Sequence, residues 1–195
     1  MKRVALATLV RERLKPDDLV VCGLGATEAA FKEAGPVGPT YFASDPMGLW
    51  PSIALGLALA RPDKQVMFLA GDGDLLMNLQ VLATIAAAPV KNLRIVVFQN
   101  GAYSSTGGQP LAGGGRLSFS TIATGAGFSW AMEARADQDI RHCLDELFGR
   151  DGPALAAIHL EDEPCPAEPA GPLAQVEQRT LFMQALQALK TQGFS

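Results

Sequence analysis

Short apolar runs recur along the chain and alternate with segments whose apolar residues follow a helical spacing. Six such runs have the length of a strand and lie at Asp18–Cys22, Thr40–Ala43, Gln65–Ala70, Leu93–Phe98, Ser129–Glu133 and Ala154–Leu160. Strands that are mostly apolar, without alternation, are typical of parallel sheets covered by helices on either side. The pattern therefore predicts an α/β fold with a doubly wound, mainly parallel six-stranded sheet and helices on both faces.

The segments between these runs predict helices. Their apolar residues recur three and four positions apart, and they lie at Ala26–Ala34, Pro51–Ala60, Leu75–Ala88, Ser118–Gly127 and Asp137–Phe148. Asp137 is a typical N-cap residue for the last of them. An amphipathic helix is also expected near the start of the chain, where Arg11 interrupts an apolar run that begins at Val4.

The C-terminal part of the chain differs in composition from the rest. Prolines and acidic residues gather in Glu161–Pro172, which predicts an irregular strap, and Leu173–Lys190 has the pattern of an amphipathic helix. This helix could pack on its own domain or embrace a partner subunit. With 195 residues and 48% apolar content, the chain fits one large domain, 1–195, in which 161–195 form the strap and the terminal helix.

Charge and cysteine content exclude several classes of function. The net charge is −4 and the 16 basic residues are scattered, so nucleic acid is not expected as a partner. The three cysteines form no Cys-x-x-Cys pair, which argues against a disulfide framework and against a zinc or iron–sulfur site. The longest apolar stretch after the first helix, Ile53–Ala60, is too short to cross a membrane. We expect a soluble, cytoplasmic protein.

The triplet Gly71-Asp72-Gly73 closes the third apolar run, and Asn100 follows the fourth. A helix of about 21 Å between them returns the chain along a strand of roughly 20 Å, so both strands end at the same edge of the sheet. Open α/β sheets bind ligands at this carboxyl edge. One carboxylate and one amide oxygen at this edge suit Mg²⁺ that is shared with a phosphate-bearing ligand. The competing interpretation of such a triplet is a plain turn.

Gly71-Asp72-Gly73, the next 26 residues and Asn100 resemble the thiamine diphosphate motif of decarboxylases and related enzymes. Residues 71–79 and 100–110 are similar to phosphonopyruvate decarboxylases and to the β subunit of sulfopyruvate decarboxylase, and the likeness extends to 52–60 and 179–186. The resemblance implies the pyrophosphate-binding domain of this family, with its thiamine diphosphate-binding fold. It also implies thiamine diphosphate and Mg²⁺ as cofactors.

The resemblance assigns roles to individual residues. The metal ligands would be the side chains of Asp72 and Asn100 and the backbone carbonyl of Ala102. Met47 stands where the family has a large apolar side chain that wedges under the thiazolium ring, although a lone methionine is more often part of a core. The carbonyl of Asp45 would accept a hydrogen bond from the aminopyrimidine ring, and this role does not depend on the side chain, in which Asp45 departs from the relatives.

The diphosphate would lie against the start of the helix that follows the motif. Gly71 and Gly73 allow the backbone to approach closely, and the N–H groups of Gly73, Asp74 and Leu75 would face the ligand. Asp74 and Pro46 are departures from the residues found in the relatives. Asp74 either brings a second carboxylate close to the diphosphate or points away as a helix cap.

Two further segments are expected at the same edge of the sheet. Thr27 could bind the diphosphate through its hydroxyl group or cap the helix after the first strand. The loop Tyr103–Gln109, rich in hydroxyl groups and glycine, could close over the cofactor with Tyr103 near the metal, or serve as a flexible connection. His142 and His159 have no partner at ligand spacing, and we assign both to structure.

In the family, a glutamate on a separate pyrimidine-binding domain activates the cofactor. A chain of one domain would therefore be a β-type subunit that forms its active site with a pyrimidine-domain α subunit in a homo- or hetero-oligomer, and it would be inactive alone. The implied reaction is decarboxylation of an anionic 2-oxoacid such as sulfopyruvate or phosphonopyruvate, although no Arg or Lys cluster near the motif accounts for a second anionic group. The alternatives are a 2-oxoacid ferredoxin oxidoreductase-like β subunit and a non-catalytic thiamine diphosphate-binding module.

Overall fold

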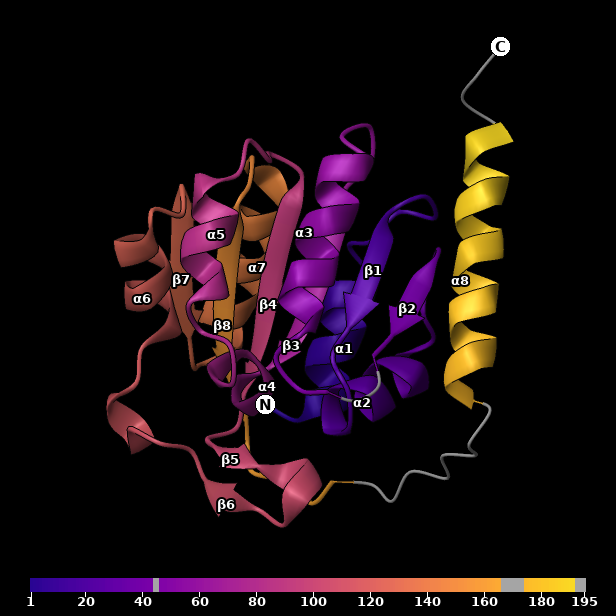
Figure 1. The fold of residues 1–195 in the computed structure, drawn as a ribbon. Helices are drawn as coiled ribbons and strands as arrows, with labels where there is room; N and C mark the ends of the chain where they lie inside the picture. Colours follow the sequence, from indigo (N-terminus) through magenta and orange to yellow (C-terminus); the bar gives the residue numbers. More distant parts are fainter. Residues whose placement is uncertain (44–45, 166–173, 192–195) are drawn as a thin grey trace.

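A computed structural model describes residues 1–43, 46–165 and 174–191 of the chain. Six parallel strands form one sheet in the order β2-β1-β3-β4-β8-β7 (Figure 1). Their bounds are β1 Leu19–Cys22, β2 Thr40–Phe42, β3 Val66–Gly71, β4 Leu93–Gln99, β7 Trp130–Ala134 and β8 Ala154–His159. Each predicted strand is present to within one residue at either end. The predicted parallel six-stranded α/β fold is confirmed.

Helices cover both faces of this sheet (Figure 1). One face carries α1 (Arg3–Arg11), α2 (Ala26–Ala34) and α7 (Asp137–Gly149), and the other carries α3 (Trp50–Ala60), α5 (Val81–Ala87) and α6 (Phe119–Ala126). The predicted opening helix is thus present as α1. A further helix, α8 (Ala174–Thr191), lies at the edge of the sheet beside β2, where the ring centroid of Phe182 is 5.4 Å from that of Tyr41.

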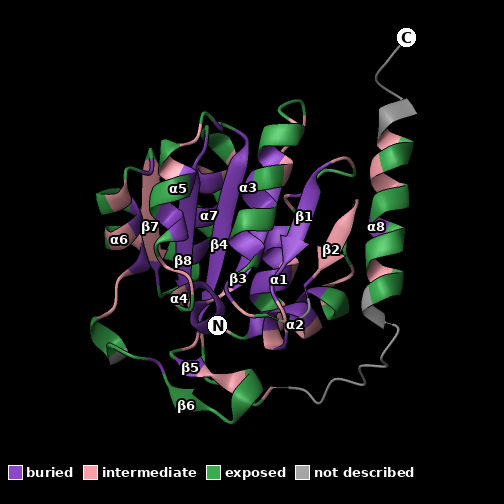
Figure 2. Ribbon diagram, in the orientation of Figure 1, coloured by how far each residue is buried: buried purple, intermediate pink, exposed green. Residues whose placement is uncertain are grey.

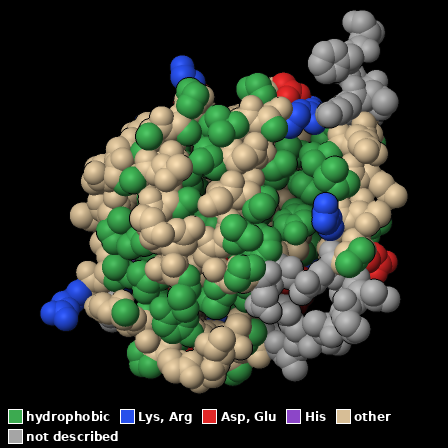
Figure 3. Space-filling model, viewed as in Figure 1, with side chains coloured by type: hydrophobic (Ala, Val, Ile, Leu, Met, Phe, Trp, Pro, Cys, Tyr) green, Lys and Arg blue, Asp and Glu red, His purple; other side chains and the backbone are tan. Residues whose placement is uncertain are grey.

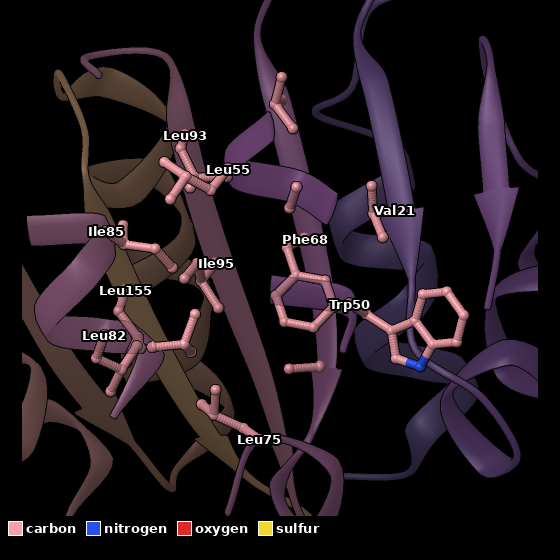
Figure 4. Close-up of a cluster of buried hydrophobic side chains, with 14 of the residues drawn as sticks. Val21, Trp50, Leu55, Phe68, Leu75, Leu82, Ile85, Leu93, Ile95 and Leu155 are labelled. Atoms are coloured by element: carbon pink, nitrogen blue, oxygen red, sulfur yellow. The ribbon is translucent and has the colours of Figure 1, made fainter. Parts of the chain in front are cut away.

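The central strands β3, β4 and β8 are buried along almost their whole length, because helices lie over both of their faces (Figure 2). Between the sheet and the helices α3 and α5, the side chains of Phe68, Ile95 and Leu155 pack against Leu55 and Ile85 (Figure 4). Full burial of a side chain such as Phe68 stabilises the fold by on the order of 2–3 kcal/mol. This packing fixes the carboxyl ends of the strands relative to one another.

The helix predicted over Leu75–Ala88 is wrong in its bounds. The chain instead forms a short helix, α4 (Asp72–Leu76), then a turn, and then α5. In the turn, the backbone N–H of Val81 bonds to the carbonyl of Asn78 at 3.1 Å, which is the tighter spacing of a turn. The apolar positions Leu75 and Leu82 stay on the core side across this break. Periodicity alone therefore could not show it.

Two smaller expectations also need correction. Asp137 is not the N-cap of α7: Ala136 occupies that position, and Asp137 is the first helical residue, where a carboxylate still favours the positive end of the helix dipole. The loop after Asn100 is not a plain flexible connection. It forms a small hairpin of β5 (Ala102–Tyr103) and β6 (Gln109–Pro110) around a 3-10 turn, η1 (Ser104–Thr106), and a second such turn, η2 (Gly114–Arg116), follows.

The strap and terminal helix are described in part. Residues 161–165 carry no regular structure, residues 166–172 of the predicted strap lie outside the described part of the chain, and α8 corresponds to the predicted terminal helix. The contact of Phe182 with Tyr41 shows α8 packed on its own domain. Within the described residues, no helix combines the length and the apolar character needed to cross a membrane.

Candidate functional site

The two halves of the Gly-Asp-Gly and Asn motif meet at the carboxyl edge of the sheet. Strands β3 and β4 are direct neighbours in parallel register, with Gly71 opposite Phe98, so Asp72 and Asn100 leave from the same edge, as the sequence predicts. Strand β1 is the other neighbour of β3, yet β1 continues into α2 on one face and β3 into α4 and α5 towards the other. Such a divergence of neighbouring strands opens the crevice in which open α/β sheets bind ligands.

Asp72 connects the two halves of the motif. Its Oδ1 accepts a hydrogen bond from the N–H of Gly73 at 2.8 Å, and its Oδ2 accepts one from the N–H of Gly101 at 2.7 Å. The residue is only 1% exposed. Burial raises the pKa of the Asp72 carboxyl to about 6, although the backbone N–H groups that point at it act in the opposite direction.

The amide of Asn100 is held by its nitrogen. Nδ2 donates to Ser104 Oγ at 2.7 Å and to Asp162 Oδ1 at 3.1 Å. Among the described residues, no donor is hydrogen-bonded to the amide oxygen, and Asn100 lines the cleft at this edge. The side-chain oxygen is therefore the group of Asn100 that remains for a ligand.

Arg3 is a residue of this site that sequence reasoning missed. It is buried, and its Nη2 donates to Ser104 Oγ at 3.2 Å while its Nη1 donates to the carbonyl of Pro164 at 3.2 Å. Of the described residues that line the cleft, Arg3 is the one with a cationic side chain. No local signal marks it, because the fold alone brings the start of α1 to the loop after β4.

A cleft with about 450 Å³ of open space lies between these segments. Nine predicted site residues line it: Thr27, Met47, Gly71, Asp72, Gly73, Asp74, Asn100, Ala102 and Tyr103. Leu75 does not, since its side chain lies in the core (Figure 4). Asp45 lies outside the described residues. Sequence reasoning thus gathered much of one cleft from four separate segments.

Close packing explains why glycine is needed in the motif. A Cβ atom placed on Gly73 would lie 2.6 Å from Cδ1 of Tyr103, which is too close for any side chain. A Cβ on Gly71 would lie 3.5 Å from Oγ1 of Thr27, within ordinary contact. The bare backbone of Gly73 therefore lets the hairpin come against α4, with the hydroxyl of Thr27 near Gly71 on the other side.

Thr27 does not cap a helix. The N-cap of α2 is Gly25, at φ +71°, and Thr27 is the second helical residue, buried at the cleft. Of the two interpretations of Thr27, the geometry supports the one in which its side chain faces the ligand site.

Asp74 does not cap a helix either and does not point away from the cleft. It is 4% exposed, its Oδ1 accepts a hydrogen bond from the N–H of Gly48 at 2.7 Å, and its buried Oδ2 has no hydrogen-bond partner among the described residues. Burial raises the pKa of Asp74 to about 6. Asp74 therefore ties the Met47–Gly48 turn to α4 at the cleft.

His159 has a partner that its sequence position did not predict. Its Nε2 lies 3.3 Å from Oε2 of Glu133 across β8 and β7, and Glu133 also accepts a hydrogen bond from Ser118 Oγ at 2.7 Å. Burial raises the pKa of Glu133, but the hydrogen bonds from Ser118, Ser120 and His159 outweigh it and hold the pKa below its usual value. None of these residues lines the cleft.

The oxygen atoms of the cleft fit a cation that a phosphate ligand shares. Among the described residues, no group of three or more His, Cys, Asp or Glu side chains could hold a metal by itself. Asp72, Asn100 and Ala102 line the same cleft, and a carboxylate, an amide oxygen and a backbone carbonyl from them would make an incomplete oxygen set. Mg²⁺ is commonly bound in this way, with substrate phosphates and water completing its six ligands.

Comparison with known proteins agrees with this geometry. Residues 29–158 match the family described as thiamine pyrophosphate enzyme, C-terminal TPP binding domain. The chain is 34% identical over 126 residues to the sulfopyruvate decarboxylase subunit beta of Methanocaldococcus jannaschii, covering 65% of this chain and 66% of the relative. The corresponding subunit of Methanothermobacter thermautotrophicus is 32% identical over 142 residues, which is 73% of each chain.

Larger proteins also match. The phosphonopyruvate decarboxylase of Streptomyces hygroscopicus is 30% identical over 162 residues, covering 83% of this chain but 39% of the relative. The thiamine diphosphate-dependent 4-hydroxybenzoylformate decarboxylase of Rhodococcus jostii RHA1 has the same fold, with a TM-score of 0.69 at 22% identity, over 84% of this chain and 33% of that one. The predicted kinship with sulfopyruvate and phosphonopyruvate decarboxylases is confirmed, and the chain belongs to the thiamine pyrophosphate enzyme family, as its C-terminal TPP-binding domain.

Proposed function

We propose that this chain is the β-type subunit of a thiamine diphosphate-dependent 2-oxoacid decarboxylase and that it holds the magnesium diphosphate end of the cofactor. The observation that carries the proposal is the joined motif, in which Asp72 accepts the N–H of Gly101 beside Asn100 at the carboxyl edge of the sheet. This bond fixes two oxygen-bearing side chains from different strands near one another before any ligand is present. A preformed site of this kind reduces the ordering cost of binding.

Each predicted site residue has a role in the proposal. The Asp72 carboxylate, the Asn100 amide oxygen and the Ala102 carbonyl bind Mg²⁺, while Gly71 and Gly73 allow the diphosphate to approach the backbone. The hydroxyl groups of Thr27 and Tyr103, the backbone of Asp74 and the N–H of Leu75 are further contacts for the diphosphate. Met47 supports the cofactor as the wedge under its thiazolium ring, and the carbonyl of Asp45 is reserved for the aminopyrimidine.

The bound cofactor would supply an electron sink for the negative charge left when CO₂ departs. For this chemistry, a carboxylic acid has to contact the aminopyrimidine ring. The acidic residues that line the described part of the cleft are Asp72 and Asp74, and both are engaged with backbone N–H groups. We therefore place the activating glutamate on an α-type partner that carries a pyrimidine-binding domain.

The outer side of α3 supports this need for a partner. The helix has no charged residue, and its exposed side carries Ile53 and Leu59. At its start, next to Gly48, Leu49 and Met77 are 42% and 57% exposed. Figure 3 shows hydrophobic side chains gathered on the face that contains α3, with few charged groups. Because Leu49 follows Met47 and Gly48 in the chain and Met47 lines the cleft, a subunit docked on this surface would lie close to the cofactor site.

The substrate of the proposed enzyme is an anionic 2-oxoacid of the sulfopyruvate or phosphonopyruvate type. The support is the named activity of the relatives together with Arg3, the cationic side chain that lines the cleft. Arg3 already donates to Ser104 and to the carbonyls of Glu163 and Pro164, so further donors for a second anionic group have to come from the partner. Location in the cytoplasm remains part of the same proposal.

Two other functions compete with this one. A 2-oxoacid ferredoxin oxidoreductase-like β subunit would pass electrons to an acceptor, and a non-catalytic module would bind the cofactor without a partner. The similarity to decarboxylase β subunits favours the proposed decarboxylase over both of these functions.

Co-purification of the full-length chain with the products of neighbouring genes tests the proposal. The expected result is a complex with a pyrimidine-domain protein that releases CO₂ from sulfopyruvate or phosphonopyruvate, while the chain alone is inactive. Activity of the isolated chain would overturn the proposal. So would a chain that binds the cofactor without any such partner and a complex that shows no turnover. Reduction of a low-potential electron acceptor by the complex would identify the oxidoreductase instead.

A further inference from the structure

Gly48 is held through both of its backbone polar groups by side chains of the motif segment. Its N–H donates to Asp74 Oδ1 at 2.7 Å, and its carbonyl accepts a hydrogen bond from Asn78 Nδ2 at 2.7 Å. Both side chains come from the same stretch of chain, α4 and the turn that follows it. Gly48 directly follows Met47, which lines the cleft.

The two hydrogen bonds are part of a tight contact between backbone segments. Gly48 is buried and has a φ of +83°, a conformation that favours glycine. A Cβ atom on Gly48 would lie 3.0 Å from Cβ of Asn78 and 3.2 Å from Cβ of Met77. A larger residue would push the turn away and break both bonds, so the sequence Met47-Gly48 and the position of Asn78 depend on each other.

This contact also explains why the helix after the motif ends early. A continuous helix from Leu75 would keep Asn78 in helical register, whereas the observed chain leaves the helix at Leu76 and places the Asn78 side chain on the carbonyl of Gly48. The N–H of Asn78 bonds to the carbonyl of Leu75 at 3.1 Å, which supports the turn.

Removal of either side chain would leave a buried backbone group of Gly48 without a partner. Such a loss is destabilising, and more so where the acceptor is a charged group. The cost falls on the turn that carries Met47, and the core, which is packed by other side chains, is not directly affected.

We propose that Asp74 and Asn78 are positioning residues that fix the Met47–Gly48 turn on the metal-binding segment and so set the place of Met47 in the cleft. The inference rests on the proposed function, in which Met47 supports the cofactor. It explains why an acidic residue stands at position 74, because the carboxyl group of Asp74 accepts the hydrogen bond from the N–H of Gly48. One segment of chain thus supplies the metal ligand Asp72 and also holds the residue that meets the other part of the cofactor.

The test compares variants that keep or remove each hydrogen-bonding group. Asp74→Asn keeps an acceptor oxygen for the N–H of Gly48, whereas Asp74→Ala removes it. Asn78→Asp has the size of asparagine but loses the donor and places an acceptor against the carbonyl of Gly48. Asp139→Ala, an exposed substitution on α7 at the far face of the sheet, serves as the control.

The first measurement is hydrogen exchange of the peptide that contains Gly48 in the full-length chain without cofactor. We expect faster exchange at Gly48 in Asp74→Ala and Asn78→Asp than in the wild type, and protection restored by Asp74→Asn. Unchanged protection in both disruptive variants would overturn the proposal. Because no ligand is present, this result stands even if the proposed function fails.

The second measurement is the affinity of the co-purified complex for thiamine diphosphate at saturating Mg²⁺. Asp74→Ala and Asn78→Asp should raise the Kd by about tenfold to a hundredfold, which corresponds to the loss of one such hydrogen bond. In a Met47→Ala background the effect of Asp74→Ala should largely disappear, because residues that act through one another are not additive. Full additivity, or an Asp74→Asn variant as weak as Asp74→Ala, would contradict positioning through Met47. A wild-type complex that binds no thiamine diphosphate would contradict the proposed function. The hydrogen-exchange result would then still decide whether Asp74 and Asn78 fix the Met47–Gly48 turn.

Discussion

Asp72 Oδ2 and the backbone N–H of Gly101 are 2.7 Å apart and join the ends of two neighbouring strands. The bond places the carboxylate of one half of the motif against the first residue after Asn100, the other half. Two oxygen-bearing groups are therefore held in one place by the protein itself. The geometry of the proposed metal site is thus set by a bond to the backbone.

Substitution of Asp72 should abolish cofactor binding. Asp72→Ala removes the carboxylate that the proposal assigns to Mg²⁺ and leaves the N–H groups of Gly73 and Gly101 without this acceptor, so both the site and the hairpin position should be lost. We expect the Kd for thiamine diphosphate with Mg²⁺ to rise by more than about a hundredfold in calorimetry of the complex. The control Asp139→Ala should bind like the wild type. An Asp72→Ala complex that binds as tightly as the wild type would contradict the proposed function.

The stability of the cofactor-free chain should fall as the pH rises from about 4 to about 7. Burial raises the pKa of Asp72 from its ordinary value of 3.8 to about 6 in the folded protein, so the folded state binds the proton more tightly than the unfolded state. The stabilisation by this proton is complete below the unfolded pKa and is lost as the pH rises through about 6. Asp74, with its pKa also raised to about 6 by burial, contributes in the same direction.

Urea denaturation of the wild type and of Asp72→Asn at both pH values checks this prediction. The variant lacks one of the two titrating groups, so its stability should fall less steeply, by on the order of 2–3 kcal/mol over the interval. Equal pH dependence of the two proteins would show that Asp72 does not titrate in this range. Added Mg²⁺ and thiamine diphosphate should reverse the trend in the wild-type complex, because they favour the ionised carboxylate.

Most of the fold followed from sequence because its strands are continuous apolar runs and its motif sits at their ends. The carboxyl edge could be predicted from element lengths, and so could the meeting of Asp72 with Asn100. The break after Leu76 could not, because the apolar spacing runs on through the turn, in which Asn78 bonds to the distant Gly48. The hydrogen bond that Asp74 accepts from Gly48 could not be predicted from local spacing either, because Gly48 is remote in the chain.

Arg3 marks a second limit of sequence reasoning. Its contact with Ser104 joins the first helix to a loop that is remote in the chain, and no pattern near either residue indicates the pairing. Local spacing can predict residues that act on neighbouring strands. It cannot predict those that a helix end or a strap brings to the same cleft.

Ser104 should control metal affinity through Asn100. Its hydroxyl accepts hydrogen bonds from Asn100 Nδ2 and Arg3 Nη2, so Ser104→Ala frees the amide whose oxygen the proposal assigns to Mg²⁺. Loss of such a supporting contact typically costs 10–100-fold in metal affinity, and we expect a rise of about tenfold in the Mg²⁺ concentration needed for cofactor binding.

Titration of the complex with Mg²⁺ at fixed thiamine diphosphate measures this effect. Ser104→Thr retains the hydroxyl and should recover most of the affinity. Ser129→Ala is a matched control, since Ser129 also donates a hydrogen bond, to the carbonyl of Pro153 at 2.9 Å, but is not among the residues that line the cleft. A Ser104→Ala complex with the Mg²⁺ requirement of the wild type would show that Asn100 is oriented without Ser104.

The exposed side of α3 should decide whether the partner binds. Ile53 is 37% exposed on a helix without charged residues, and a glutamate there would bring a charge into an apolar interface, where an unpaired charge is strongly unfavourable. Ile53→Glu should therefore weaken association with the α-type subunit by at least about tenfold and reduce decarboxylation in proportion. The fold of the isolated chain should change little, because the core side of α3, with Trp50 and Ala54, is untouched.

Gln138→Glu, exposed on α7 at the opposite face, adds the same charge as a control. Size-exclusion chromatography with the partner measures the complex, and circular dichroism measures the fold. A stable Ile53→Glu complex would place the interface elsewhere. Loss of both complex and fold would mean that Ile53 supports the fold and is not part of a docking surface.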